Sequence, residues 1–386
     1  MFISQPGKNN KSNQMNELKQ IIIEEIRANG PMPLEDYMAR ALGDNTHGYY
    51  TKKDPFGKKG DFITAPETSQ VFGELIGLWG LDFWTNSGSW SNFNLVELGP
   101  GRGTLMRDIT NAVKGHPTYL QSARLHLLET SPVLRDLQNR TLSHITREKS
   151  ACQWHENIAD LLEACHGMPV IVYANEFFDA LPIRQYVQEN DSWALRCVDV
   201  EDNELVPITS KDRLLTEHLP AAQDFSPGDI LETTPLAESI VMQLANYIAK
   251  YGGALLMIDY GYTKNQPGDT FQALSDHRTV SPYKSPGDAD LTAHVNFKRL
   301  ADIAEDTSCK SLGPVSQRNF LLSLGLEQRL ESLSLNATAQ QKIDLLAARN
   351  RLIGVDQMGV LFNVLAVTKS DAALPAGFEE ISRDVL

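Results

Sequence analysis

Short apolar runs alternate with amphipathic helical stretches through the middle of the chain. Five runs have the length and apolar character of buried strands: 94–98, 125–129, 151–155, 169–174 and 254–259. A further strand is predicted within 359–367. Strands that alternate with helices in this way form a parallel sheet with helices on both faces. The pattern therefore predicts an α/β fold with a Rossmann-like sheet.

The regions outside this alternation predict additions to the sheet. Residues 1–16 are polar and are expected to form a disordered leader. Residues 17–92 are expected to form an N-terminal helical extension, which begins with an amphipathic helix over 17–29. The main domain would then be 93–386. Within it, two β-rich runs at about 184–232 predict an inserted antiparallel hairpin, and about 290–353 is predicted to be a helical C-terminal region.

A loop with glycine at every second position follows the strand at 94–98. A helical pattern starts directly after Glu97-Leu98-Gly99-Pro100-Gly101-Arg102-Gly103-Thr104, so the glycines lie on a strand-to-helix turn. Doubly wound sheets bind cofactors at such turns. The spacing E-x-G-x-G-x-G is that of class I methyltransferases, which bind S-adenosylmethionine (SAM). We therefore expect Glu97, Gly99, Gly101, Gly103 and Thr104 to contact SAM.

Two other interpretations of this loop stay open. The dinucleotide pattern G-x-G-x-x-G needs glycine at 104, where Thr104 stands, and this weakens the NAD interpretation. The second interpretation is an ordinary tight turn that happens to be rich in glycine. Glu129 ends the following strand and suits a ribose diol, because a carboxylate can accept from both hydroxyls. NAD-binding proteins use the same device, so Glu129 indicates a nucleoside without identifying the cofactor.

Polar side chains also follow two later strands. Asn175 and Glu176 come after the strand at 169–174, and Asp259 ends the strand at 254–259. The carboxyl ends of parallel strands share one edge of the sheet, so these residues are expected near the cofactor. Glu176 could hold a cationic or amine acceptor, and Asn175 could accept from an N–H group. Asp259 could either orient the acceptor or merely accept from loop amides.

The composition limits the classes of partner. The chain has 386 residues and a formal net charge of −14, which suits a cationic cofactor or a basic protein better than a nucleic acid. The four cysteines show no metal-binding spacing, the N-terminus shows no targeting pattern, and no apolar run reaches the length of a membrane span. We expect a cytoplasmic protein, monomeric or homodimeric, with no metal, no nucleic-acid partner and no membrane insertion.

Several segments, in this order along the chain, resemble one known family. They are 47–50, 60–67 with 72–74, 97–104, 175–182, 252–253 with 258–261, 290–294 and 356–359. On these segments the chain resembles the MidA family of SAM-dependent methyltransferases, whose mitochondrial members are complex I assembly factors. The resemblance runs from about 35 to 367, which is nearly the whole chain.

This resemblance implies a class I methyltransferase fold and symmetric dimethylation of arginine in a protein, with a complex I subunit as the target in mitochondria. By position, Gly60, Asp61, Pro66 and Glu67 would cover the cofactor. Asn175 and Glu176 would meet the acceptor, and Asn175 would also contact the cofactor. The chain departs from the family at Asn363, where lysine is usual, and at 316–319, which varies a Thr-Gln-Gly stretch. Both departures bear on the acceptor rather than on SAM binding.

Transfer to arginine needs a carboxylate that pairs with guanidinium N–H groups and orients one nitrogen toward the methyl group. Glu176 is the first candidate for this catalytic role, and Glu67 and Asp259 are candidates for a second carboxylate. His294 is a candidate proton acceptor, although a single histidine between apolar residues is more often structural. Rival functions are a SAM-binding assembly chaperone with little turnover, a small-molecule O- or N-methyltransferase and an NAD-dependent oxidoreductase.

Overall fold

The main sheet of the computed structural model is mixed and has the strand order β15-β16-β10-β5-β2-β3-β4, with β14 beside β10. The structure describes residues 16–52, 64–143, 152–213, 219–275 and 278–379. Strands β2 to β5 and β10 run parallel, whereas β16 is antiparallel to β10 and to β15. The bounds are β2 Phe93–Leu98, β3 Ala123–Leu128, β4 Gln153–His155, β5 Val170–Asn175, β10 Gly253–Tyr262, β14 Val295–Asn296, β15 Cys309–Ser316 and β16 Phe362–Lys369. The predicted α/β, Rossmann-like class is confirmed.

The strand order reverses between β2 and β5. From β2 the chain moves outward to β3 and β4, and it then returns to the other side of β2 to form β5 and β10. The register pairs Leu98 at the end of β2 with Ala174 near the end of β5. The loops after these two strands therefore start side by side, at the place where open α/β sheets bind ligands.

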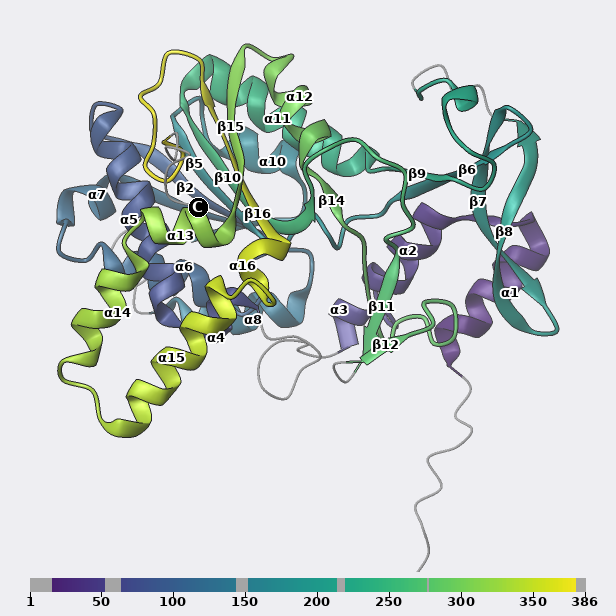
Figure 1. Cartoon of the computed structure of the whole chain (residues 1–386), viewed down its shortest axis with the longest axis horizontal. Helices are drawn as coiled ribbons and strands as arrows, with labels where there is room; N and C mark the ends of the chain where they lie inside the picture. The colour runs from purple at the N-terminus through teal and green to yellow at the C-terminus, as the bar shows by residue number, and fades with distance from the viewer. Residues whose placement is uncertain (1–15, 53–63, 144–151, 214–218, 276–277, 380–386) are drawn as a thin grey trace, which may run out of the picture.

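Helices cover both faces of this sheet (Figure 1). One face packs against α5 Gln70–Asn86, α6 Thr104–Ala112, α7 Pro117–Ser122, α13 Gln317–Ser323, α14 Leu326–Ser334 and α15 Ala339–Ile353. The other face packs against α10 Ile158–Ala164, α11 Pro235–Tyr251 and α12 Phe297–Glu305. Helix α8, Pro132–Thr141, follows β3. The two apolar layers bury the sheet strands on both sides, which is why those strands read as continuous apolar runs.

The N-terminal region contributes to two different cores. Helices α1 Glu17–Asn29, α2 Leu34–Gly43 and α3 Tyr49–Lys52 belong to the N-terminal end, and their apolar side chains form a separate cluster with Ile183 and Val198. Helix α5 instead packs in the main core. Asn16 caps α1 by accepting from the Lys19 backbone N–H at 2.8 Å. The rest of the predicted leader lies outside the described residues.

The predicted inserted hairpin is part of a larger sheet, at the right of Figure 1. Its strands are β1 Met32–Pro33, β6 Arg184–Glu189, β7 Ser192–Glu201, β8 Glu204–Arg213 and β9 Ile230–Thr233. The predicted pair is β6 and β7, which are antiparallel. The hairpin prediction covered two of the five strands. It missed β8 and β9, which lie within the predicted insertion, and β1, which comes from a distant part of the chain and pairs with β7 only in the folded protein. Strands β11 Gln272–Ser275, β12 Arg278–Val280 and β13 Asp290–Thr292 form a third sheet.

The C-terminal region differs from the prediction in three places, and the first is its start, where β13 and β14 occupy residues predicted to be helical. The stretch expected to be helical contains β15, an edge strand that pairs with β16. Its half-buried side chains and the Gly313-Pro314 pair hide the period-2 signal of a strand. The last strand starts later than predicted, since Met358–Leu361 forms the short helix α16. Among the described helices, none combines the length and apolar character needed to cross a membrane.

Candidate functional site

The glycine loop after β2 adopts a backbone that favours glycine. Gly99, Gly101 and Gly103 have φ values of 62°, 51° and 77°, in the left-handed region that other residues rarely adopt. A Cβ atom at Gly99 would lie 2.8 Å from Cδ2 of Phe177, which follows β5. The glycines therefore permit both the turn and the close approach of the loop after β5.

This loop forms one wall of a pocket at the reversal point of the sheet, here called the cofactor pocket. Its lining residues are Thr64, Pro66, Glu67, Glu97, Gly99, Pro100, Gly101, Arg102, Thr104, Leu105, Asn175 and Glu176. The fold thus brings together eight of the predicted site residues: Pro66, Glu67, Glu97, Gly99, Gly101, Thr104, Asn175 and Glu176. Gly103 caps α6 and does not line the pocket. Gly60 and Asp61 lie outside the described residues.

Two lining residues present acceptor atoms that lack hydrogen bonds. Oε2 of Glu97 and Oδ1 of Asn175 are buried and have no partner among the described residues. Glu97 is only 3% exposed, and burial raises the pKa of its carboxyl group to about 8. Unpaired buried acceptors cost free energy, and a ligand with N–H or O–H donors would satisfy them. The amino acid and ribose parts of SAM carry such donors, so the residues present fit this cofactor.

Glu129 is connected to the glycine loop by Gln138, a residue that the sequence did not single out. Its carboxylate accepts from the Ser131 backbone N–H at 2.8 Å and from Nε2 of Gln138 at 2.9 Å. The same Nε2 donates to the Gly101 carbonyl at 2.7 Å. Gln138, on α8, thus links the predicted ribose ligand to the loop. Nothing in the local pattern of α8 identifies this role, because it depends on where the helix packs.

A short helix closes another side of the pocket. Helix α4, Ala65–Thr68, places Pro66 and Glu67 against the glycine loop. The Glu67 carboxylate accepts from the Thr104 hydroxyl and lies 3.5 Å from Nη1 of Arg102. Glu67 therefore fastens α4 to the loop. Its hydrogen bond and its ion pair are both made to residues of the glycine loop.

Glu176 occupies the opposite side of the pocket. Its Oε1 accepts from the Ala65 backbone N–H at 3.0 Å and from Nδ2 of Asn175 at 3.1 Å. Burial raises the pKa of its carboxyl group to about 7, and the charge of Asp179 adds to the shift. Its backbone is left-handed, with a φ of 50°. Such a conformation in a non-glycine residue is often found at functional sites, where it aims a side chain.

Asp259 takes the structural one of the two roles left open by the sequence. It is fully buried within β10, directly after Ile258, which pairs with the last residue of β5. Its Oδ2 accepts from the backbone N–H groups of Phe178 and Asp179 at 3.0 and 3.2 Å, and its Oδ1 accepts from that of Tyr260 at 2.9 Å. The carboxylate therefore fixes the loop that follows β5, and these contacts favour the structural role over that of orienting the acceptor.

His294 is not among the residues that line the cofactor pocket. Its ring packs edge-on against Tyr260, with 5.2 Å between ring centroids, and its backbone N–H donates to the Thr270 hydroxyl. Burial lowers the pKa of the imidazole. Among the described residues, no cluster of histidine, cysteine and acidic side chains is arranged to hold a metal ion.

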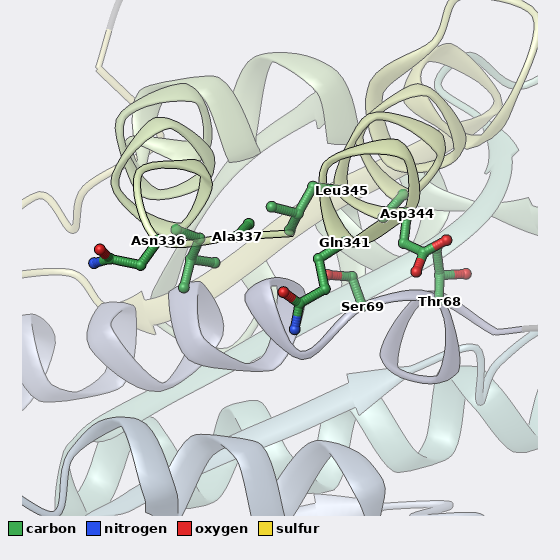
Figure 2. Close-up of a pocket in the computed structure, with 9 residues that line it drawn as sticks. Thr68, Ser69, Asn336, Ala337, Gln341, Asp344 and Leu345 are labelled. Carbon is green, nitrogen blue, oxygen red and sulfur yellow. The ribbon is translucent and has the colours of Figure 1, made fainter. Parts of the chain in front are cut away.

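A second pocket lies on the other side of α4, between this helix and the hairpin formed by α14 and α15. Figure 2 shows Gln341 and Asp344 of α15 projecting toward Ser69 and Thr68. Leu333, Leu345 and Ala348 supply apolar lining. Helix α4 thus separates this groove from the cofactor pocket.

Known proteins resemble this chain over almost its full length. A family model of S-adenosyl-L-methionine-dependent methyltransferases matches residues 75–315. The mitochondrial protein arginine methyltransferase NDUFAF7 of Xenopus tropicalis is 34% identical over 98% of this chain and 93% of its own length. The Caenorhabditis elegans homologue is 35% identical over 91% and 86% of the two chains. A Burkholderia thailandensis protein crystallised with S-adenosyl-homocysteine has a TM-score of 0.81 and 26% identity, with 98% of each chain covered.

These similarities confirm the predicted methyltransferase family and its cofactor, and they correct one expectation. The relatives are named as mitochondrial proteins, which contradicts a cytoplasmic location. That expectation rested on the cysteine spacing, on the lack of a visible targeting pattern among the first residues and on the lack of an apolar run of membrane-spanning length. Since the family model covers most of the chain and a cofactor-bound relative shares its fold, the chain belongs to this family of S-adenosyl-L-methionine-dependent methyltransferases.

Proposed function

We propose that this enzyme methylates arginine side chains of a protein, with symmetric dimethylarginine as the product. The observation that carries this proposal is Glu176, a carboxylate fixed at the edge of the cofactor pocket through one of its two oxygens. The names of the relatives support the same acceptor, since they are protein arginine methyltransferases.

The cofactor side of the pocket would hold SAM through backbone and unpaired acceptors. Glu97 and Asn175 offer the buried oxygens that lack donors, and the glycine loop brings bare backbone to the same space. Glu129, beside Gly101, would accept from ribose hydroxyls. When bound, SAM supplies a methyl group that its sulfonium already activates, so most of the remaining rate enhancement must come from alignment of the acceptor.

Glu176 would provide this alignment. A guanidinium group stays protonated in proteins, so its reacting nitrogen must be turned toward the methyl group and must release a proton to solvent as it is methylated, while the other nitrogens keep the positive charge. Oε1 of Glu176 already accepts two hydrogen bonds, which leaves Oε2 to accept from the guanidinium N–H groups. A charged pair of this kind in a pocket with little water is stronger than one at the surface.

The molecule that receives the methyl group would be a protein rather than a small molecule. The groove between α4 and the α14–α15 hairpin lies next to the cofactor pocket and offers apolar and amide groups to a polypeptide. The resemblance to the MidA family favours a subunit of respiratory complex I as the acceptor.

The test is transfer of label from methyl-labelled SAM to proteins in a lysate of cells that lack the enzyme, followed by hydrolysis and identification of the labelled amino acid. We expect symmetric dimethylarginine. Label on lysine or on hydroxyl-bearing residues would show that the acceptor residue is not arginine. Label on small molecules alone would indicate a small-molecule methyltransferase. Binding of S-adenosylhomocysteine without any transfer would indicate an assembly chaperone.

A further inference from the structure

The side-chain amide of Gln138, on α8, connects three elements beside the cofactor pocket. The side chain is fully buried. Its Nε2 donates to the Gly101 carbonyl at 2.7 Å and to Oε2 of Glu129 at 2.9 Å. Its Oε1 accepts from Nε1 of Trp154, on β4, at 2.8 Å. One amide therefore joins the glycine loop, the residue that follows β3, and β4.

These partners are compatible with one orientation of the amide. The indole N–H of Trp154 can only donate, whereas the Gly101 carbonyl and an ionised Glu129 carboxylate can only accept. Exchange of Nε2 and Oε1 would bring the amide oxygen against two acceptors and the NH2 group against the indole N–H. The orientation thus follows from the chemistry of the three partners. Trp154 therefore directs both N–H groups of Gln138 toward Gly101 and Glu129.

The Glu129 carboxylate is held through both of its oxygens. Oε1 accepts from the Ser131 backbone N–H at 2.8 Å, and Oε2 accepts from Gln138. A donor on each oxygen fixes the rotation of the carboxylate plane. Burial raises the pKa of this carboxyl group, and the hydrogen bonds from Ser131 and Gln138 oppose that shift. Because a carboxylate offers about four acceptor sites, sites remain for hydroxyl groups of a ligand.

The glycine loop packs on the same residue. Gly101, which lines the cofactor pocket, accepts from Gln138 through its carbonyl. Gly103 lies against the backbone and stem of Gln138, since a Cβ atom at Gly103 would lie 3.5 Å from both Cα and Cγ of Gln138. The loop and the Glu129 carboxylate therefore share one support, and a change in the Gln138 amide acts on both.

We propose that Gln138 is a positioning residue for the ribose of the cofactor, and that Trp154 fixes its amide so that Glu129 presents its remaining acceptor sites to the ribose hydroxyls. This inference rests on the proposed contact between Glu129 and the ribose, and it does not depend on which molecule receives the methyl group. Neither Gln138 nor Trp154 lines the cofactor pocket. Discrimination between a ribose with hydroxyls and one without them is therefore set by side chains that do not touch the ligand.

The experiment measures the binding of two ligands to the full-length enzyme by isothermal titration. One ligand is S-adenosylhomocysteine, and the other is its analogue without the 2′ and 3′ hydroxyls. The ratio of the two dissociation constants is the measured quantity. The wild type should bind the analogue at least about 30-fold more weakly, because two hydrogen bonds to a charged group are lost.

Two variants should reduce this ratio. Gln138→Met keeps the length of the side chain and removes the amide, so the ratio should fall to about fivefold or less. Trp154→Phe keeps the amide and removes the donor that orients it, so the ratio should fall to about tenfold.

The matched control is Gln185→Met, in the inserted sheet. Gln185 is also fully buried, and its Nε2 donates to the carboxylates of Glu232 at 2.7 Å and Asp269 at 2.8 Å. Loss of this amide should lower the melting temperature and leave the ratio at the wild-type value. A reduced ratio in this control as well would assign the effect to general destabilisation and overturn the inference.

The remaining outcomes separate this inference from the proposed function. An unchanged ratio in Gln138→Met would overturn the inference even if both ligands bound more weakly, and Trp154→Phe decides in the same way if Gln138→Met does not fold. Equal binding of both ligands by the wild type would refute the contact between Glu129 and the ribose, and this inference with it. Failure to label arginine would refute only the proposed acceptor, since the ratio is measured without one.

Discussion

The two sides of the pocket are built in opposite ways. The cofactor side is built on the glycine loop: Gly99 and Gly101 line the pocket in left-handed conformations, and the unpaired oxygens of Glu97 and Asn175 add acceptors. The opposite side, here called the acceptor side after the proposed function, depends on the Glu176 side chain, which the Ala65 N–H and the Asn175 amide hold in place, and on Asp259, which fixes the loop that follows β5. Changes on the first side should therefore act through shape, and changes on the second side should act through charge.

This difference explains why one side is local in sequence and the other is not. The glycine loop takes its conformation from consecutive residues that follow one strand. The acceptor side needs β5 and β10, which are separated by the inserted sheet and by α11, to end at the same edge. Helix α4 touches both sides, through Glu67 on the loop and the Ala65 N–H on Glu176.

The strongest test of the comparison is Glu176→Gln. Glutamine keeps an oxygen for the Ala65 and Asn175 donors but loses the charge that pairs with a guanidinium group. We expect the transfer rate to fall by about 100- to 1,000-fold. Isothermal titration with S-adenosylhomocysteine should show affinity within about threefold of the wild type. Transfer at an undiminished rate would remove Glu176 from the acceptor side.

The converse test is Gly101→Val on the cofactor side. A β-branched residue is strained at a φ of 51°, and its side chain would enter the wall of the pocket. We expect S-adenosylhomocysteine binding to weaken by at least about 30-fold, which is roughly 2 kcal/mol. Gly88→Val is the matched control, because Gly88 also has a positive φ of 96° but lies in open space. Equal losses in both variants would mean that the effect is general strain.

A third test concerns a buried histidine in the parallel sheet. His126, fully buried on β3, hydrogen-bonds to His155 and to the Asn94 side chain. Burial, reinforced by His155, lowers the pKa of His126 to about 4. The unfolded chain takes up this proton below a pH of about 6.5, whereas the folded protein resists it until about 4.

The contribution of neutral His126 to the free energy of unfolding is therefore fully present above pH 6.5 and is lost as the pH falls toward 4. The loss amounts to about 1 to 3 kcal/mol. Urea unfolding at pH 7.5 and at pH 5.0 measures this loss. The free energy of unfolding of His126→Asn should decrease less between the two pH values than that of the wild type. His116→Asn, at an exposed position, should keep the wild-type decrease. An equal decrease in both variants would assign the acid sensitivity to other groups.

The smallest expected effect comes from Glu67→Gln. Loss of the charge opposite Arg102 should loosen α4 from the glycine loop and weaken S-adenosylhomocysteine binding by about three- to fivefold. Glu74→Gln is a suitable control, because Glu74 forms an ion pair with Arg329 away from the pocket. A fall in transfer rate far larger than the loss of affinity would place Glu67 on the acceptor side.

The sequence by itself determined the elements whose signals are local. The buried strands β2, β3, β5 and β10, the helix that starts at Glu17 and the left-handed glycine turn follow from residue order, because apolar spacing and glycine act over a few residues. The cofactor followed from the same turn, and the resemblance across separated segments supplied the family.

Only the tertiary structure decided which polar groups meet. In the folded protein the Asp259 carboxylate accepts from loop N–H groups, Glu67 contacts the glycine loop, and Gln138 donates to Glu129. The tertiary structure also paired β1 with β7 and β15 with β16. These outcomes depend on the packing of segments far apart in the chain, and a carboxylate acquires its role from the donors that packing brings to it.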